Sequence, residues 1–249
     1  MAYRNLGEFI QKLEIENELV RIKEQVNPKF EIAEITDRIS KNNGPALLFE
    51  NTGTGFPVFI NGFGSYRRMC MALKLNSLDS AIDEGIEIAD ELISPGKSLL
   101  DKLNKLMKLK KVASYMPKVK DGKGECQEVI MNPVNISKLP VLTCWQNDGG
   151  PFLTLPIVHT KDPSTGIRNV GMYRMQVFNE TTTGMHWHLH KVSARHYNEY
   201  KKLGQKMPVA VALGGDPVYT YSATAPLPDN FDEYIFAGFL RKKSVELVK

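Results

Sequence analysis

The stretch RNVGMYRMQVFNETTTGMHWHLHK, residues 168–191, decides how the second half of this chain is expected to fold. Two runs typical of β-strands flank the six-residue segment NETTTG, residues 179–184. A connection this short leaves no room for a crossover helix, so the two runs are predicted to form an antiparallel hairpin.

The second run places three of the five histidines of the chain in alternation, as His186, His188 and His190. In an extended strand these side chains share one face. Such a face can bind a metal, although neutral imidazole suits Mn, Fe, Zn and Cu alike. Histidines on the wetter face of a half-buried strand explain the pattern about equally well.

The first run favours a binding site, because the hairpin brings Asn169 and Arg174 close to the histidines. An amide oxygen and an imidazole, joined by a carboxylate from elsewhere, form a mixed site that suits Mn²⁺ or Mg²⁺. The Arg174 guanidinium suits a carboxylate or phosphate. Asn169 and Arg174 face opposite sides of an unbroken strand, so either Gly171 hosts a bulge or the two residues serve separate ends of one ligand.

Further strand-like runs indicate a β-rich second domain over residues 116–249. They are CQEVIM (126–131), LTLPIVHT (153–160), PVAVALGG (208–215) and the final SVELVK (244–249). A short helix is predicted in DNFDEYIFAGFLRKK (229–243), with Asp229 or Asn230 as its cap and Glu233 in its first turn. The last strand has no evident partner, which suggests that a C-terminal portion is missing.

Residues 1–115 predict an α/β domain. A helix begins at Asn5, and a second is expected to have Asn27 as cap and Pro28 at its first position. Strands are predicted at 46–50 and 57–60 and helices at about 65–73 and 77–93. A lysine-rich helix with a leucine stripe is predicted over 97–111.

Composition limits the classes of protein. The chain has 249 residues, 42% of them hydrophobic, and a formal net charge of +4. No apolar run approaches the roughly 18 residues of a membrane helix, and no secretory signal is present, so the cytoplasm is the expected location. No nucleic-acid-binding module is recognised, and no nucleic-acid partner is expected.

Several motifs, in this order, closely resemble the UbiD family of prenylated-FMN-dependent decarboxylases. They are FGSYRRMCMAL (63–73), GECQEVIMNPVNISKLPVLTCWQNDGGPFLT (124–154), NVGMYRMQ (169–176), MHWHLHK (185–191), PVAVALGGDP (208–217) and APLPDNFDEYIFAGFLR (225–241). The resemblance implies an N-terminal α/β domain followed by a split β-barrel that binds flavin, as in flavin reductases. The family's C-terminal domain is absent from this chain, which looks truncated.

The resemblance also implies a function. Family members are cytoplasmic carboxy-lyases that act reversibly on aromatic or α,β-unsaturated acids. An example of such an acid is 3-polyprenyl-4-hydroxybenzoate, which resembles the intermediates of ubiquinone biosynthesis. They use prenylated FMN, Mn²⁺ and often K⁺. A flavin prenyltransferase supplies the cofactor, full-length forms are homo-oligomers, and a prenylated substrate implies peripheral contact with a membrane.

The family motifs assign roles to residues of this sequence. The metal ligands fall on Asn169, His190 and Glu233, and the catalytic arginine on Arg174. The cofactor-binding positions fall on Met172, Tyr173, Arg174, His186, Trp187, His188, Lys191 and Val192. Arginines are common in relatives at the positions of His186 and Lys191, so phosphate binding is expected to be weaker here.

Two alternatives stay open. The proton-donating acids of the family lie beyond residue 249, so this chain alone is expected to be poorly active or inactive. It is then a truncated flavin-binding fragment or a non-catalytic subunit. A metal hydrolase built on His186, His188 and His190 is disfavoured, because no nearby glutamate is placed as a general base.

Overall fold

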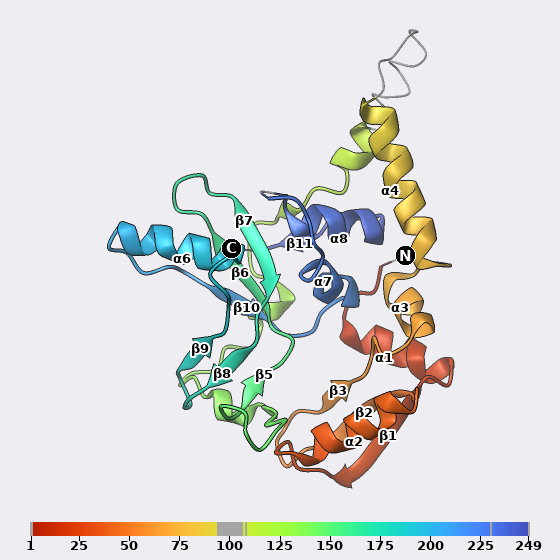
Figure 1. The fold of residues 1–249 in the computed structure, drawn as a ribbon, viewed down its shortest axis with the longest axis vertical. Helices are drawn as coiled ribbons and strands as arrows, with labels where there is room; N and C mark the ends of the chain where they lie inside the picture. Colours follow the sequence, from red (N-terminus) through yellow and green to blue (C-terminus); the bar gives the residue numbers. More distant parts are fainter. Residues whose placement is uncertain (1, 94–106, 108, 230, 249) are drawn as a thin grey trace.

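The computed structural model describes residues 2–93, 107, 109–229 and 231–248, with helices and strands interspersed along the chain (Figure 1). The first half contains α1 (Leu6–Ile15), β1 (Leu19–Gln25), α2 (Glu31–Lys41), β2 (Ala46–Asn51), β3 (Val58–Ile60), α3 (Tyr66–Leu73) and α4 (Leu78–Ile93). The second contains β4 (Lys118–Val119), the 3₁₀ turns η1 (Glu125–Gln127) and η2 (Ile136–Lys138), β5 (Phe152–Leu153), β6 (Ile157–Lys161), β7 (Arg168–Met172), β8 (Met175–Val177), β9 (Thr183–Met185), α6 (Val192–Lys202), β10 (Ala210–Ala212), α7 (Pro217–Ser222), α8 (Glu233–Arg241) and β11 (Glu246–Leu247).

The N-terminal part is the predicted α/β unit. Its sheet has the order β1-β2-β3, with β1 and β2 parallel and β2 and β3 antiparallel. The predicted strands at 46–50 and 57–60 and the helices at 65–73 and 77–93 are confirmed. Strand β1 was not predicted, since most of its residues are exposed and its sequence LVRIKEQ shows little apolar alternation.

The starts of the first two helices differ in how well local sequence determines them. Asn5 caps α1 as predicted, accepting a hydrogen bond from the Glu8 amide at 3.0 Å. The predicted start of α2 at Asn27 and Pro28 is wrong, because the Asn27 side chain accepts from the Lys29 amide and closes a turn there. The helix begins at residue 31, after Phe30 adopts a left-handed φ of 72°.

The second half contains two antiparallel sheets, ordered β10-β6-β7 and β5-β8-β9, as the short connections predicted. The run 168–176 is not one strand, however. It breaks at Tyr173 and Arg174, so that β7 pairs with β6 while β8 pairs with β5 and β9. Gly171 hosts no bulge. Its missing side chain gives room to Tyr173, whose hydroxyl oxygen would lie 2.4 Å from a Cβ at position 171.

The alternating histidines do not form the predicted strand face. Pairing of β8 with β9 ends at Met185, and one further hydrogen bond joins the His186 amide to the Arg174 carbonyl at 3.1 Å. Residues 186–191 then turn into α6. Among the described residues no three His, Cys, Asp or Glu side chains gather as a metal site, which contradicts a hydrolase centre built on His186, His188 and His190.

Two other expectations for the second half need correction. The run 126–131 is not a strand, and its apolar side chains are exposed, with Val129 at 89%. The Asp229 cap is wrong, since Asp232 caps α8 by accepting from the Tyr234 amide at 2.9 Å, while Asn230 lies outside the described residues. The predicted final strand is confirmed as β11, and β4 is its parallel partner.

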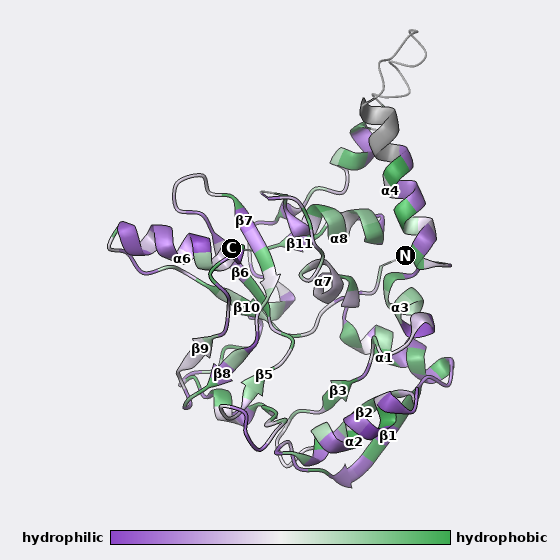
Figure 2. Ribbon diagram, in the orientation of Figure 1, coloured by the Kyte–Doolittle hydropathy of each residue, from purple (hydrophilic) through white to green (hydrophobic). Residues whose placement is uncertain are grey.

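The largest core cluster joins the two halves of the chain. It packs Leu73 of α3 against Ile157 and Val170 of the sheet, Val218 of α7 and residues of α8. Figure 2 shows α8 as largely apolar, whereas α6 is mostly polar along its length. The predicted leucine stripe of the lysine-rich helix, Leu99, Leu103 and Leu106, lies outside the described residues. None of the helices in the described part of the chain is long and apolar enough to cross a membrane.

Candidate functional site

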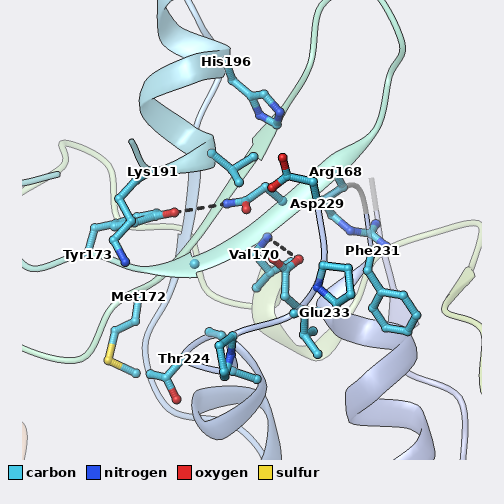
Figure 3. Close-up of a pocket in the computed structure, with 18 of the residues that line it drawn as sticks. Arg168, Val170, Met172, Tyr173, Lys191, His196, Thr224, Asp229, Phe231 and Glu233 are labelled. Carbon is cyan, nitrogen blue, oxygen red and sulfur yellow. Dashed lines mark hydrogen bonds between the residues drawn. The ribbon is translucent and has the colours of Figure 1, made fainter. Parts of the chain in front are cut away.

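A cavity of about 370 Å³ lies where strand β7, helix α6 and helix α8 meet (Figure 3). Its walls are β7, the first residues of α6, the loop 223–229 and the first residue of α8. This volume falls within the range of about 300–1,000 Å³ that is common for ligand pockets.

The structure brings most of the predicted site residues to this one cavity. The three predicted metal ligands and four of the predicted cofactor contacts all line it. They are Asn169, Met172 and Tyr173 in or next to β7, His190, Lys191 and Val192 at the start of α6, and Glu233 of α8.

Four predicted contacts, Arg174, His186, Trp187 and His188, do not line the cavity. The Arg174 Nε donates to Nδ1 of His186 at 2.9 Å, and its guanidinium lies 4.2 Å from the centre of the Phe152 ring. Trp187 packs edge-on against Tyr173 at 6.0 Å and borders a second, more open cavity of about 680 Å³.

Asn169 is buried and its side-chain amide has a defined orientation. Its Nδ2 donates to Oγ of Ser193 at 3.0 Å and to the Tyr173 hydroxyl at 3.4 Å. Both amide hydrogens therefore have protein partners. Since no described residue donates to Oδ1, this oxygen is left to accept from or coordinate a ligand.

Glu233 is fixed by the main chain of the neighbouring strand. Its Oε2 accepts a hydrogen bond from the Val170 amide at 2.9 Å, drawn as a dashed line in Figure 3. Burial raises the pKa of the Glu233 carboxyl, while the hydrogen bonds from backbone amides oppose that shift. A buried carboxylate with a raised pKa gains from a nearby cation, so this group suits a metal ligand.

Arg168 supports the start of α8 from the other side. Its guanidinium pairs with Asp232, the cap of α8, and lies 5.4 Å from the centre of the Tyr234 ring. Its Nε is buried and has no hydrogen-bond partner in the described part of the chain. Arg168 lines the cavity, which makes it a cation that sequence reasoning missed although it directly precedes Asn169.

The start of α6 presents the positive end of a helix to the cavity. Lys191 is the N-cap and makes no side-chain capping hydrogen bond. The first amide groups of the helix and the Lys191 cation thus lie together at the cavity wall. This combination favours an anion, and phosphate groups bind at helix starts of this kind.

Sequence reasoning also missed Ser193 and His196 of α6 and Thr160 of β6, which form a buried polar group behind Asn169. Helix α6 was not predicted, because its sequence VSARHYNEYKK lacks an apolar stripe. The signal that could have found these residues is the three-residue spacing of Ser193 and His196, which shares one face only in a helix.

Comparison with known proteins identifies the family. Residues 117–249 match the UbiD family, described as the 3-octaprenyl-4-hydroxybenzoate carboxy-lyase Rift-related domain, and residues 10–85 match its N-terminal domain. An uncharacterised protein of Archaeoglobus fulgidus is 46% identical over 255 residues, which cover 100% of this chain and 51% of that protein. The chain belongs to the UbiD family.

The fold of this UbiD chain is that of solved UbiD-class enzymes. Vanillic acid decarboxylase of Sedimentibacter hydroxybenzoicus, in its closed form, superposes with a TM-score of 0.81 at 27% identity, over 100% of this chain and 51% of that one. The UbiD-class enzyme HmfF of Pelotomaculum thermopropionicum, in an evolved dimeric form with prFMN, gives 0.79 at 24% identity over 99% and 53%.

The UbiD chain spans about half the length of the relatives that it matches. The expected fold, an α/β N-terminal part followed by the Rift-related domain of the family, is confirmed. The division near residue 115 and the role of each site residue stay predictions.

Proposed function

We propose that this chain is the cofactor-binding part of a carboxy-lyase that decarboxylates an aromatic or α,β-unsaturated acid, using prenylated FMN and Mn²⁺. One observation carries the proposal. Asn169, His190 and Glu233 come from a strand, a turn and a helix, yet they line one cavity beside the positive end of α6.

The residues present fit a Mn²⁺ ion. Asn169 offers an amide oxygen, His190 an imidazole and Glu233 a carboxylate, a mixture that Mn²⁺ accepts more readily than a zinc site would. Three protein ligands leave coordination positions for a cofactor phosphate. The ion would neutralise that phosphate and hold it in the cavity, a role distinct from Lewis-acid action on the substrate.

The residues also fit a flavin phosphate. The uncapped amide groups of α6 and the Lys191 ammonium supply donors and positive charge, and Met172 and Tyr173 line the adjoining wall. His186, Trp187 and His188 follow β9 beyond the cavity lining, so we expect them to meet the cofactor outside this cavity.

Prenylated FMN, when bound, supplies the electron sink that loss of CO₂ requires. We assign Arg174 to the substrate carboxylate. Its guanidinium is held by the Phe152 ring, by His186 and by Asp148, whose Oδ2 lies 3.3 Å from Nη1 of Arg174. This arrangement fixes the direction of the planar group before a substrate arrives, which favours a bidentate contact.

The chain spans about half the length of the relatives that it matches. The activity of the whole protein is therefore tested separately from the binding of cofactor and metal to this chain.

Binding is tested with FMN and Mn²⁺ on the chain itself. We expect FMN to bind more tightly when Mn²⁺ is present. We expect His190→Ala to weaken Mn²⁺ binding at least tenfold, because changing a residue that only hydrogen-bonds to a metal ligand already lowers metal affinity by about 10–100-fold. His188→Ala is the control for Mn²⁺ binding measured without FMN, because this histidine lies outside the cavity lining and its expected contact is to the cofactor. Equal loss in both variants, or no FMN binding by the wild type, contradicts the proposal.

Activity is tested separately by loading the chain with prenylated FMN, made by a flavin prenyltransferase, and measuring CO₂ release from a panel of aromatic acids. Release by the chain alone supports the enzyme. Release only after the C-terminal half of a relative is added in trans supports an activity of the whole protein. Bound cofactor without release in either case leaves a non-catalytic binder.

A further inference from the structure

We propose that His196 positions Asn169 as a metal ligand through a buried relay of two hydroxyl groups, Ser193 and Thr160. This inference rests on the proposed function and deepens it. His196 lines the upper part of the cavity in Figure 3 and makes no direct hydrogen bond to Asn169.

The fold places the four members of the relay face to face. Thr160 and Asn169 are direct cross-strand partners in the antiparallel pair of β6 and β7, so their side chains share one face of the sheet. Ser193 and His196 lie three residues apart on α6, which puts them on one side of that helix. All four residues are at most 5% exposed.

The hydrogen bonds form one continuous chain. Nδ1 of His196 lies 3.0 Å from Oγ1 of Thr160, which lies 3.1 Å from Oγ of Ser193. Oγ of Ser193 in turn lies 3.0 Å from Nδ2 of Asn169. Each hydroxyl has one hydrogen to donate and can accept two hydrogen bonds, so a hydroxyl that donates in one bond of the chain must accept in the next.

An unprotonated Nδ1 on His196 fixes the direction of these hydrogen bonds. With Nδ1 unprotonated, Thr160 donates to it and accepts from Ser193, and Ser193 then accepts from the Asn169 amide. With a hydrogen on Nδ1, Thr160 accepts from the ring, and its own hydrogen is released for a bond to Ser193. The Ser193 hydrogen can then be donated to Asn169 only if the Asn169 amide flips to present Oδ1.

The two directions present different atoms to the cavity. In the first, the Asn169 amide group donates its two hydrogens to Ser193 and Tyr173, and Oδ1 can coordinate a cation. In the second, Oδ1 turns to Ser193 and the NH₂ group faces the cavity. An amide NH₂ group cannot coordinate a metal. Burial lowers the pKa of His196, which favours the neutral ring, and we assign its hydrogen to Nε2 because that tautomer lets Nδ1 accept from Thr160.

The first test reads the relay without metal or cofactor. In protein labelled with ¹⁵N-histidine, NMR is expected to show Nδ1 of His196 with the shift of an unprotonated nitrogen and the hydrogen on Nε2. In Thr160→Val the Nδ1 shift should change because its donor is removed. A hydrogen on Nδ1 in the wild type overturns the proposal.

The second test measures Mn²⁺ binding with FMN present, using the electron paramagnetic resonance signal of free Mn²⁺. Thr160→Val is expected to weaken binding by about 10–100-fold, the usual effect of losing an outer contact of a ligand. Thr160→Ser, which keeps the hydroxyl, should restore most of it. Thr52→Val is the matched control, since Thr52 is as buried as Thr160 and hydrogen-bonds only within its own loop.

The outcomes separate the relay from the function on which it rests. Wild-type affinity in Thr160→Val, with folding checked by urea denaturation, overturns the relay and leaves the proposed function intact. A wild type that binds no Mn²⁺ overturns the proposed function and the positioning role together, and the NMR experiment still decides the direction of the hydrogen bonds. Equal weakening in Thr52→Val and Thr160→Val marks a general loss of stability and also overturns the relay.

Discussion

Replacing Gly238 by alanine should destabilise the protein, because Gly238 lets α8 approach the backbone before β4. A Cβ at this position would lie 2.1 Å from the Tyr115 carbonyl oxygen and 3.0 Å from its carbon. Neither atom can rotate away, so α8 must withdraw by roughly 1 Å. The side chains near this contact are buried, namely Ala237, Leu240 and Tyr115, and their van der Waals contacts would weaken as the helix moves.

The magnitude follows from two opposing effects. Overpacking a dense interior costs about 1–3 kcal/mol, and a clash with rigid backbone belongs at the upper end. Alanine regains about 1 kcal/mol of helix propensity over glycine. The net loss is about 2 kcal/mol, which lowers Tm by about 4–8 °C for a chain of this size.

Gly85→Ala provides the matched control, since Gly85 lies in helix α4 and nothing stands within 4 Å of the position that its Cβ would take. We expect this variant to gain up to about 1 kcal/mol. Both variants are measured by thermal and urea unfolding followed by circular dichroism. Stability of Gly238→Ala equal to or above that of the wild type would refute the packing argument.

Three further changes test the charges. Asp216→Ala leaves Arg241 buried and unpaired, 2.8 Å from the lost oxygen, and should cost about 3–5 kcal/mol in urea unfolding, against less than about 1 for the exposed Asp229→Ala. Burial lowers the pKa of His159, so as the pH falls below about 6.5 this histidine is protonated in the unfolded chain before it is protonated in the folded one. The free energy of unfolding should therefore decrease, and an unchanged urea midpoint between pH 7.5 and 5.5 would contradict this. Glu233→Gln keeps an oxygen that accepts from the Val170 amide and removes a buried negative charge, which burial disfavours, as the raised pKa of Glu233 shows. The apoprotein should therefore be as stable as the wild type or slightly more stable in urea unfolding, while calorimetry shows weaker Mn²⁺ binding.

Local sequence determined those elements whose signals are themselves local. Asn5 caps α1 because its side chain meets an amide three residues away, and strand β2 forms from a continuous apolar run. The family motifs named Asn169, His190 and Glu233, and these three do line one cavity. Each such inference depended on residues close together in the chain or on a matched motif.

Other features depended on contacts that the sequence does not display. The histidine run lost its strand geometry because β7 and β8 join different sheets, and the break lies where Tyr173 folds back over Gly171. Helix α6 was missed because it is polar on most of its surface, and its role follows from the few residues that it turns towards β6 and β7.

The sequence by itself determined the family, the order of the two parts and the chemical types of the metal ligands. Only the tertiary structure decided which atom Asn169 turns to the cavity and how Glu233 is held, since these depend on Ser193, Thr160 and Val170. The physical reason is that a hydrogen bond depends on distance and direction in space. Thr160 and Ser193 are 33 residues apart in the chain, yet their hydroxyl oxygens lie 3.1 Å apart once the sheet and helix have packed.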